Sequence, residues 1–152
     1  MPIICELPNQ TLDTLTIKIQ AKVLEARGRP NVHVIFLHPN FRMLRIDSVR
    51  EGFGCLMNTV SFHSKTFVIF CDATGAYPNN GTTLLSSHQV NSELRRLTTQ
   101  WPLNSLYLDL QPVLSSKDWT RRLNLRSPGQ IRLGQAITRA LSGTPPEVFL
   151  HG

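Results

Sequence analysis

The fold of this chain is decided by two stretches, Val32-His33-Val34-Ile35-Phe36-Leu37 and Thr66-Phe67-Val68-Ile69-Phe70-Cys71. Both are short runs of β-branched and other apolar residues, which is typical of strands covered on both faces of a sheet. Leu106-Tyr107-Leu108-Asp109-Leu110 has the same character, and Ile3-Ile4-Cys5-Glu6-Leu7 is a shorter apolar run near the start. The sequence therefore predicts four strands.

Helical segments alternate with these strands. Apolar residues recur at helical spacing after Thr11, after Ser48 and after Ser86, and the tetrapeptide Ser127-Pro128-Gly129-Gln130 begins a further helix. Alternating strands and helices imply right-handed βαβ crossovers and a mainly parallel sheet of four to five strands. We predict an α/β fold, a three-layer α/β/α sandwich.

Length and composition place the chain in a broad class. Its 152 residues are 41% apolar, enough for one α/β domain, residues 1–143, with a C-terminal tail, 144–152, that docks on the body or on a partner. The apolar runs are far shorter than the roughly 20 residues of a membrane helix, and the chain begins without a secretory-signal pattern. Three cysteines without a close pair predict reduced thiols, and therefore an intracellular, cytoplasmic protein. The short apolar runs predict that it does not bind membranes.

The basic charge is concentrated in the second half. The net charge is +6, and residues 91–152 hold eight basic residues against four acidic ones. One hypothesis is therefore a nucleic-acid-binding module with Trp119 as a stacking surface; the alternative is that Trp119 packs in the core and the arginines cover a helix. The basic residues concerned are Lys117, Arg121, Arg122, Arg126 and Arg132, with Arg139 beyond them.

A candidate ligand site follows from the expected sheet, because ligands of parallel α/β sheets bind beyond the carboxyl ends of the strands. The polar residues expected on that rim are Asn9, His38, Asn40, Asp72 and Tyr77. His38 and Asp72 could each hold a ligand. Alternatively, His38 makes only a backbone hydrogen bond and Asp72 only caps the following turn.

A small enzyme, esterase-like or of another type, is a further hypothesis. It would use His38 and Asp72 near the loop of residues 72–85, with Asn40, Tyr77 and His88 as further candidates. No spacing in the sequence brings these residues together, and no catalytic residue can be assigned. The sequence has no Gly-rich phosphate loop and no metal-ligand spacing, so we expect neither cofactor nor metal.

Several segments together resemble the SGNH/GDSL hydrolases. Asn91 to Leu94 matches an N-x-x-L helix, Asp109-Leu110 matches a strand ending in D-L, and residues 123–133 are similar to the closing block D-x-x-H-L-x-x-x-G. Upstream, residues 7–12 look like the "PGAT" turn, and His38-Pro39-Asn40-Phe41 looks like the G-x-N-D block. The resemblance implies a flavodoxin-like or SGNH-like sandwich over about residues 4–142.

The resemblance fails at the catalytic positions. The family's catalytic His falls on Asn124, its Asp partner on Arg121, and the Gly before the matching oxyanion residue Asn40 on His38. A second oxyanion Gly falls near Asn9, and the nucleophile block G-D-S has no counterpart. Either residues 3–7 or a second chain would fill the place of the family's first, central strand.

The replacement of both catalytic side chains, by Asn124 and Arg121, favours a pseudoenzyme. An amide cannot take a proton from a serine, and a guanidinium cannot stabilise an imidazolium. The leading hypothesis is a non-catalytic SGNH-like domain that binds a ligand or a protein partner, including a second copy of itself, at the strand-end rim.

Overall fold

The computed structural model describes residues 12–36, 46–72, 81–120, 125–142 and 147–151. Within them the helices are α1 (Leu12–Glu25), α2 (Ile46–Val60), α3 (Gly81–Gln100) and α4 (Ser127–Leu141), with a short 3-10 helix η2 (Ser116–Asp118). The strands are β1 (Asn31–Ile35), β2 (Thr66–Cys71), β3 (Ser105–Leu108) and β4 (Glu147–His151).

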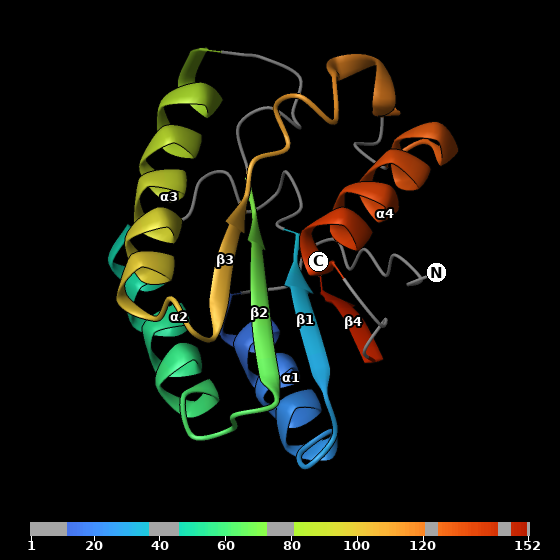
Figure 1. Cartoon of the computed structure of the whole chain (residues 1–152). Coiled ribbons are helices and arrows are strands. Elements are labelled where there is room, and N and C mark those ends of the chain that lie inside the picture. The colour runs from blue at the N-terminus through green and yellow to red at the C-terminus, as the bar shows by residue number, and fades with distance from the viewer. Residues whose placement is uncertain (1–11, 37–45, 73–80, 121–124, 143–146, 152) are drawn as a thin grey trace.

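The strands form one parallel sheet in the order β3-β2-β1-β4. Helices α1, α2 and α3 lie side by side on one face, and α4 lies on the other (Figure 1). The predicted α/β fold with a parallel sheet between helices is confirmed.

Two apolar cores follow from the alternation of side chains along the strands. On β1, Ile35 faces the core beneath α1, α2 and α3, whereas Val34 belongs to the core beneath α4. Phe53 of α2 meets Phe70 of β2 edge-to-face, with ring centroids 5.3 Å apart. Both faces of the two central strands are therefore covered, which explains their continuous apolar sequences.

The C-terminal segment supplies a strand that the sequence pattern did not predict. β4 pairs with β1 in register, so that His33 lies opposite Phe149 and Ile35 opposite His151. Of the two alternatives for the tail, docking on the body or on a partner, the structure shows the first. The predicted strand at residues 3–7 lies outside the described part of the chain.

Helix boundaries differ from the predictions at three ends. α2 begins at Ile46, which places Ser48 inside its first turn, and α3 begins at Gly81 rather than near Ser86. The N-cap of α4 is Arg126, without a side-chain cap, one residue before the predicted Ser127. Gln130 ties this first turn to the preceding residue, because its side-chain amide donates to the Leu125 carbonyl at 2.9 Å.

Candidate functional site at the strand-end rim

Asp72 is held at the carboxyl end of β2, where the strand-end rule predicts a site. The backbone of Asp72 still belongs to the sheet, since its amide donates to the Leu108 carbonyl at 2.8 Å. Only 3% of the residue is exposed. A carboxyl group buried to this extent requires hydrogen-bond partners from the chain.

Asn91 of α3 is one of those partners. Its side-chain amide donates to the Asp72 carboxyl, and the residue is itself buried. It lies on the inward face of α3, between the core residues Val90 and Leu94. Site prediction from the sequence missed Asn91, although the N-x-x-L element that begins with it could have indicated a functional position.

Asp109 completes a pair of carboxyl groups. The hydrogen bond from Asp72 lowers the pKa of Asp109, and the bond from the Gln111 backbone amide, at 3.0 Å, adds to this effect. A hydrogen bond between two carboxyl groups requires one proton between them, so Asp72 and Asp109 titrate as a pair. Asp109 is exposed, so the rim presents an ionised carboxylate to solvent.

Tyr107 of β3 is close to both carboxyl groups of this pair. Burial, followed by the charge of Asp72, raises the pKa of its phenol. The hydroxyl lies beside Asp72, but the geometry does not complete a hydrogen bond, and the group has no such partner among the described residues. The Arg95 guanidinium lies over the ring, 4.8 Å from its centroid. We call Asp72, Asn91, Tyr107 and Asp109 the rim cluster.

Cys71, the neighbour of Asp72, is not an activated nucleophile. Burial, and then the charge of Asp72, raises the pKa of its thiol. A reactive thiol needs a lowered pKa and access to solvent, and Cys71 has neither. Cys55, in contrast to Cys71, is exposed.

Most of the other predicted site residues lie outside the described part of the chain. They are Asn9, His38, Asn40, Tyr77, Arg121, Arg122 and Asn124. His88 lies exposed on α3. Of the rim residues expected from sequence, the structure therefore describes Asp72, and it adds Asn91, Tyr107 and Asp109.

The basic segment after β3 packs against the body. Trp119 is buried and stacks on Phe36, with ring centroids 5.8 Å apart. Of its two predicted positions, a stacking surface for nucleic acid or the core, the structure therefore shows the core. Arg132 forms an ion pair with Asp118, and Arg126 donates to the Trp119 carbonyl at 3.3 Å. Lys117 is exposed.

The rim cluster is suited to accept hydrogen bonds rather than to attack a substrate. It offers an ionised carboxylate at Asp109, and the two weakly acidic groups beside it, the Cys71 thiol and the Tyr107 phenol, both have raised pKa values. Over the described ranges no three His, Cys, Asp or Glu side chains gather as metal ligands. None of the helices described here is long and apolar enough to cross a membrane.

The arrangement of strands and helices defines an α/β sandwich with a parallel sheet. No family model matches the sequence, and no curated protein matches it. The fold is similar to that of a catalytic mutant of an acetylxylan esterase from Geobacillus stearothermophilus, with a TM-score of 0.68 and 14% identity over 89% of this chain and 69% of that one. A mutant described as an acetyl-xylooligosaccharide esterase, also from Geobacillus, gives the same TM-score and coverage at 13% identity.

Proposed function

We propose that this chain is a non-catalytic SGNH-like domain that binds a ligand at the carboxyl-end rim of its sheet. The observation that carries the proposal is the rim cluster, in which Asp72 accepts a hydrogen bond from Asn91 and interacts with Asp109, whose carboxylate is open to solvent. Such a site recognises a ligand with hydroxyl or ammonium donors.

The sequence supports the non-catalytic part of the proposal. By resemblance to the SGNH/GDSL pattern, the positions of the catalytic His and Asp carry Asn124 and Arg121. The pKa of the Cys71 thiol is raised, which leaves it protonated at neutral pH. The nucleic-acid alternative has less support, because Trp119 is buried and Arg132 is paired with an acid.

The test of catalysis uses the whole chain with 4-nitrophenyl acetate and, separately, with a fluorophosphonate that labels activated serines. We expect hydrolysis at the rate of a buffer blank and no covalent adduct in the mass spectrum. An adduct on a single serine, together with turnover that is lost when that serine is changed to Ala, would overturn the proposal.

The test of binding uses two probes followed by chemical shifts of the backbone amides. Xylotriose offers hydroxyl donors and is related to the xylo-oligosaccharides named for the structural neighbour, and spermidine offers ammonium donors. We expect at least one probe to shift the amides of Asp72, Asn91 and Asp109. Failure of both probes contradicts a donor-binding rim.

Two matched variants locate the binding. Asp109→Asn removes the exposed carboxylate of the rim cluster, and Asp47→Asn removes an equally exposed carboxylate on α2. The first should weaken probe binding at least tenfold, and the second should leave it unchanged. Equal effects would show that the probe responds to overall charge.

A further inference from the structure

A second buried polar cluster lies between β1 and β4, away from the rim cluster. It consists of Asn31, His33 and His151, which we call the edge cluster. None of the His33 surface is exposed, and only 1% of Asn31 and 2% of His151. Two histidines with so little solvent contact must satisfy one another or a neighbouring group.

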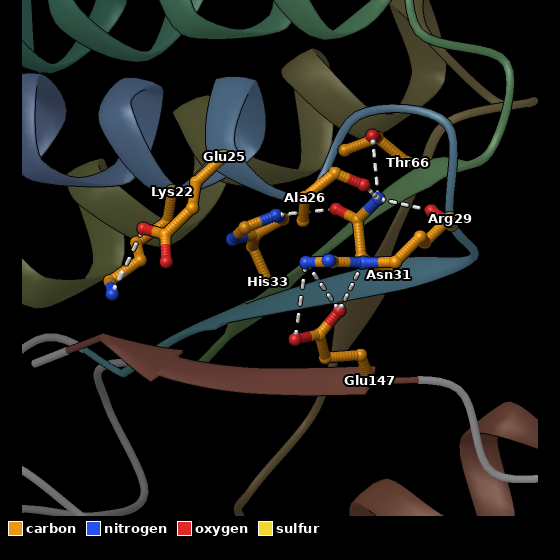
Figure 2. Close-up of polar contacts among 8 residues, drawn as sticks. All are labelled: Lys22, Glu25, Ala26, Arg29, Asn31, His33, Thr66 and Glu147. Atoms are coloured by element: carbon orange, nitrogen blue, oxygen red, sulfur yellow. Dashed lines mark hydrogen bonds and ion pairs between the residues drawn. The ribbon is translucent and has the colours of Figure 1, made fainter.

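The bonds of Asn31 fix the direction of hydrogen bonding through the cluster. Its side-chain amide donates to the Arg29 carbonyl at 2.7 Å and to the Thr66 hydroxyl at 3.1 Å (Figure 2). The amide oxygen is therefore left to accept, and it lies 2.7 Å from Nε2 of His33. His33 must carry its proton on Nε2.

The proton on Nε2 leaves Nδ1 of His33 as an acceptor. This atom lies 3.0 Å from Nε2 of His151, which must then be the donor. The remaining nitrogen, Nδ1 of His151, is buried and has no hydrogen-bond partner among the described residues. Both imidazoles are neutral in this arrangement, and β4 is connected to β1 by a bond between them.

The surroundings oppose a positive charge on either ring. Helix α1 contributes Lys18 and Lys22, whose charges lower the pKa of His151. The Lys22 ammonium also forms an ion pair with Glu25 at 3.3 Å and lies over the Phe149 ring. β2 contributes the uncharged Thr66 and Val68.

At the start of β4, Glu147 forms an ion pair with Arg29 at 3.2 Å. Phe149 stacks on His33, with centroids 5.1 Å apart. Burial lowers the pKa of His33 to about 4, and burial together with the charges of His33, Lys18 and Lys22 lowers the pKa of His151 to about 3. No acidic group faces either ring from these elements.

We propose that the His33–His151 pair is an acid-sensitive switch that releases β4 from the edge of the sheet while β1, β2 and β3 remain folded. A proton added to the pair can be carried by either ring, because the proton between Nδ1 of His33 and Nε2 of His151 can belong to one or the other. The bond between the rings is kept, but Nδ1 of His151 gains an N–H with no acceptor among the described residues. A proton added to Nδ1 of His151 would leave a buried cation beside two lysines.

The release is confined to β4 because that strand pairs with β1 alone in the described sheet. The other strands are held by the two apolar cores, to which β4 contributes one fully packed residue, Leu150.

The direction of the pH effect follows from the lowered pKa values. The released histidines bind protons near pH 6.5 and the docked ones near 4 and 3, so docking is strongest above pH 6.5 and is lost as the pH falls toward 4. Between pH 7 and pH 5 the equilibrium constant for release should rise on the order of 20-fold if one imidazole titrates, and about 500-fold if both do.

The experiment follows amide chemical shifts and heteronuclear NOEs of the whole chain from pH 7.5 to pH 4. We expect the signals of residues 148–151 to move to unstructured values while those of β2 and β3 stay folded. Retention of β4 at pH 4, or loss of all strands in one transition, would overturn the proposal.

Variants separate this pair from the other histidines. His151→Phe keeps an aromatic ring next to Phe149 and cannot titrate, so β4 should stay docked at pH 5. His38→Gln, His63→Gln and His88→Gln, changed together, should leave the release unchanged. A transition that disappears with these three would exclude the edge cluster as its origin.

A measurement on the unmodified chain remains decisive if His151→Phe does not fold. Imidazole nitrogen shifts at pH 7.5 should show both rings neutral, with His33 protonated on Nε2. A His33 that carries its proton on Nδ1, or on both nitrogens, is incompatible with the proposed switch.

Discussion

The rim cluster and the edge cluster both bury polar side chains, but they differ in charge and in access to solvent. In the rim cluster a buried carboxyl, Asp72, is bonded to an exposed carboxylate, Asp109. In the edge cluster an amide and two imidazoles form an uncharged row enclosed by β1, β4 and α1. Burial alone therefore does not distinguish the two clusters, whereas a charged group that reaches the surface does.

The largest effect that tests this contrast is expected at Asn31. Asn31→Leu removes the acceptor of His33 and the donor to Thr66 inside a sealed cluster, so unfolding in urea should show a loss of about 3 kcal/mol. Asn104→Leu is the matched control, because its single bond, to the Thr66 carbonyl, is long at 3.4 Å, and it should cost about 0.5 kcal/mol. Similar losses at the two positions would show that the edge cluster adds little stability.

A smaller effect is expected at Asn91. Asn91→Leu takes away a donor to the buried Asp72 carboxyl, so the loss should be about 2 kcal/mol in the same urea measurement. Ser92→Ala, at an exposed neighbouring position of α3, should change stability by less than about 0.5 kcal/mol. A stabilising Asn91→Leu would contradict the assigned bond.

The position of the shared proton can be tested with two substitutions of Asp72. Asp72→Asn keeps a donor to Asp109 and an acceptor for Asn91, so the Asp109 pKa should stay lowered; Asp72→Ala should let it return toward its ordinary value. Carboxyl carbon shifts during an acid titration measure both.

The sign of the accompanying stability effect is fixed by the same shift. A lowered Asp109 pKa contributes stability above the unfolded pKa and loses it as the pH falls, so the acid-induced loss should be smaller in Asp72→Ala than in the unmodified chain. Asp72→Ala should also be about 1 kcal/mol less stable than Asp72→Asn at neutral pH. If Asp72→Asn raises the Asp109 pKa as much as Asp72→Ala does, the proton is not on Asp72.

The smallest effect is expected for the ion pair beside the edge cluster. Arg29 and Glu147 lie 3.2 Å apart, with 58% and 43% of their side chains exposed, so Arg29→Gln should reduce stability by less than about 0.5 kcal/mol. Thermal unfolding at low and high salt measures it. A loss above about 1 kcal/mol would mean that this pair, rather than the neutral row of side chains, keeps β4 on the sheet.

The sequence was sufficient to place β1, β2 and β3 to within about two residues. β1 and β2 are covered on both faces and carry uninterrupted apolar runs, and β3, although it lies at an edge of the described sheet, also has a mostly apolar sequence. β4 was not predicted from the sequence. Its first and last residues, Glu147 and His151, are polar, so the apolar run between them is too short to indicate a strand paired with β1.

The same reasoning explains which site residues were found. Asp72 was predicted because it directly follows a buried strand, a position that a single sequence reveals. Asn91 contacts Asp72 across 19 residues, and His33 contacts His151 across 118. No local pattern contains such partners, so a buried histidine within a strand looks like any other core residue until the fold is known.

The separation between β1 and β4 also affects how the chain folds. The two histidines are 118 positions apart, a separation that Arg29 and Glu147 share and that no other described polar contact exceeds. Contacts of this range are slow to form. At about 5–20 residues per second of synthesis, β1 leaves the ribosome about 6–24 seconds before β4 exists. During that interval its hydrogen-bonding edge is uncovered, which makes it the place where a nascent chain would meet a chaperone or aggregate.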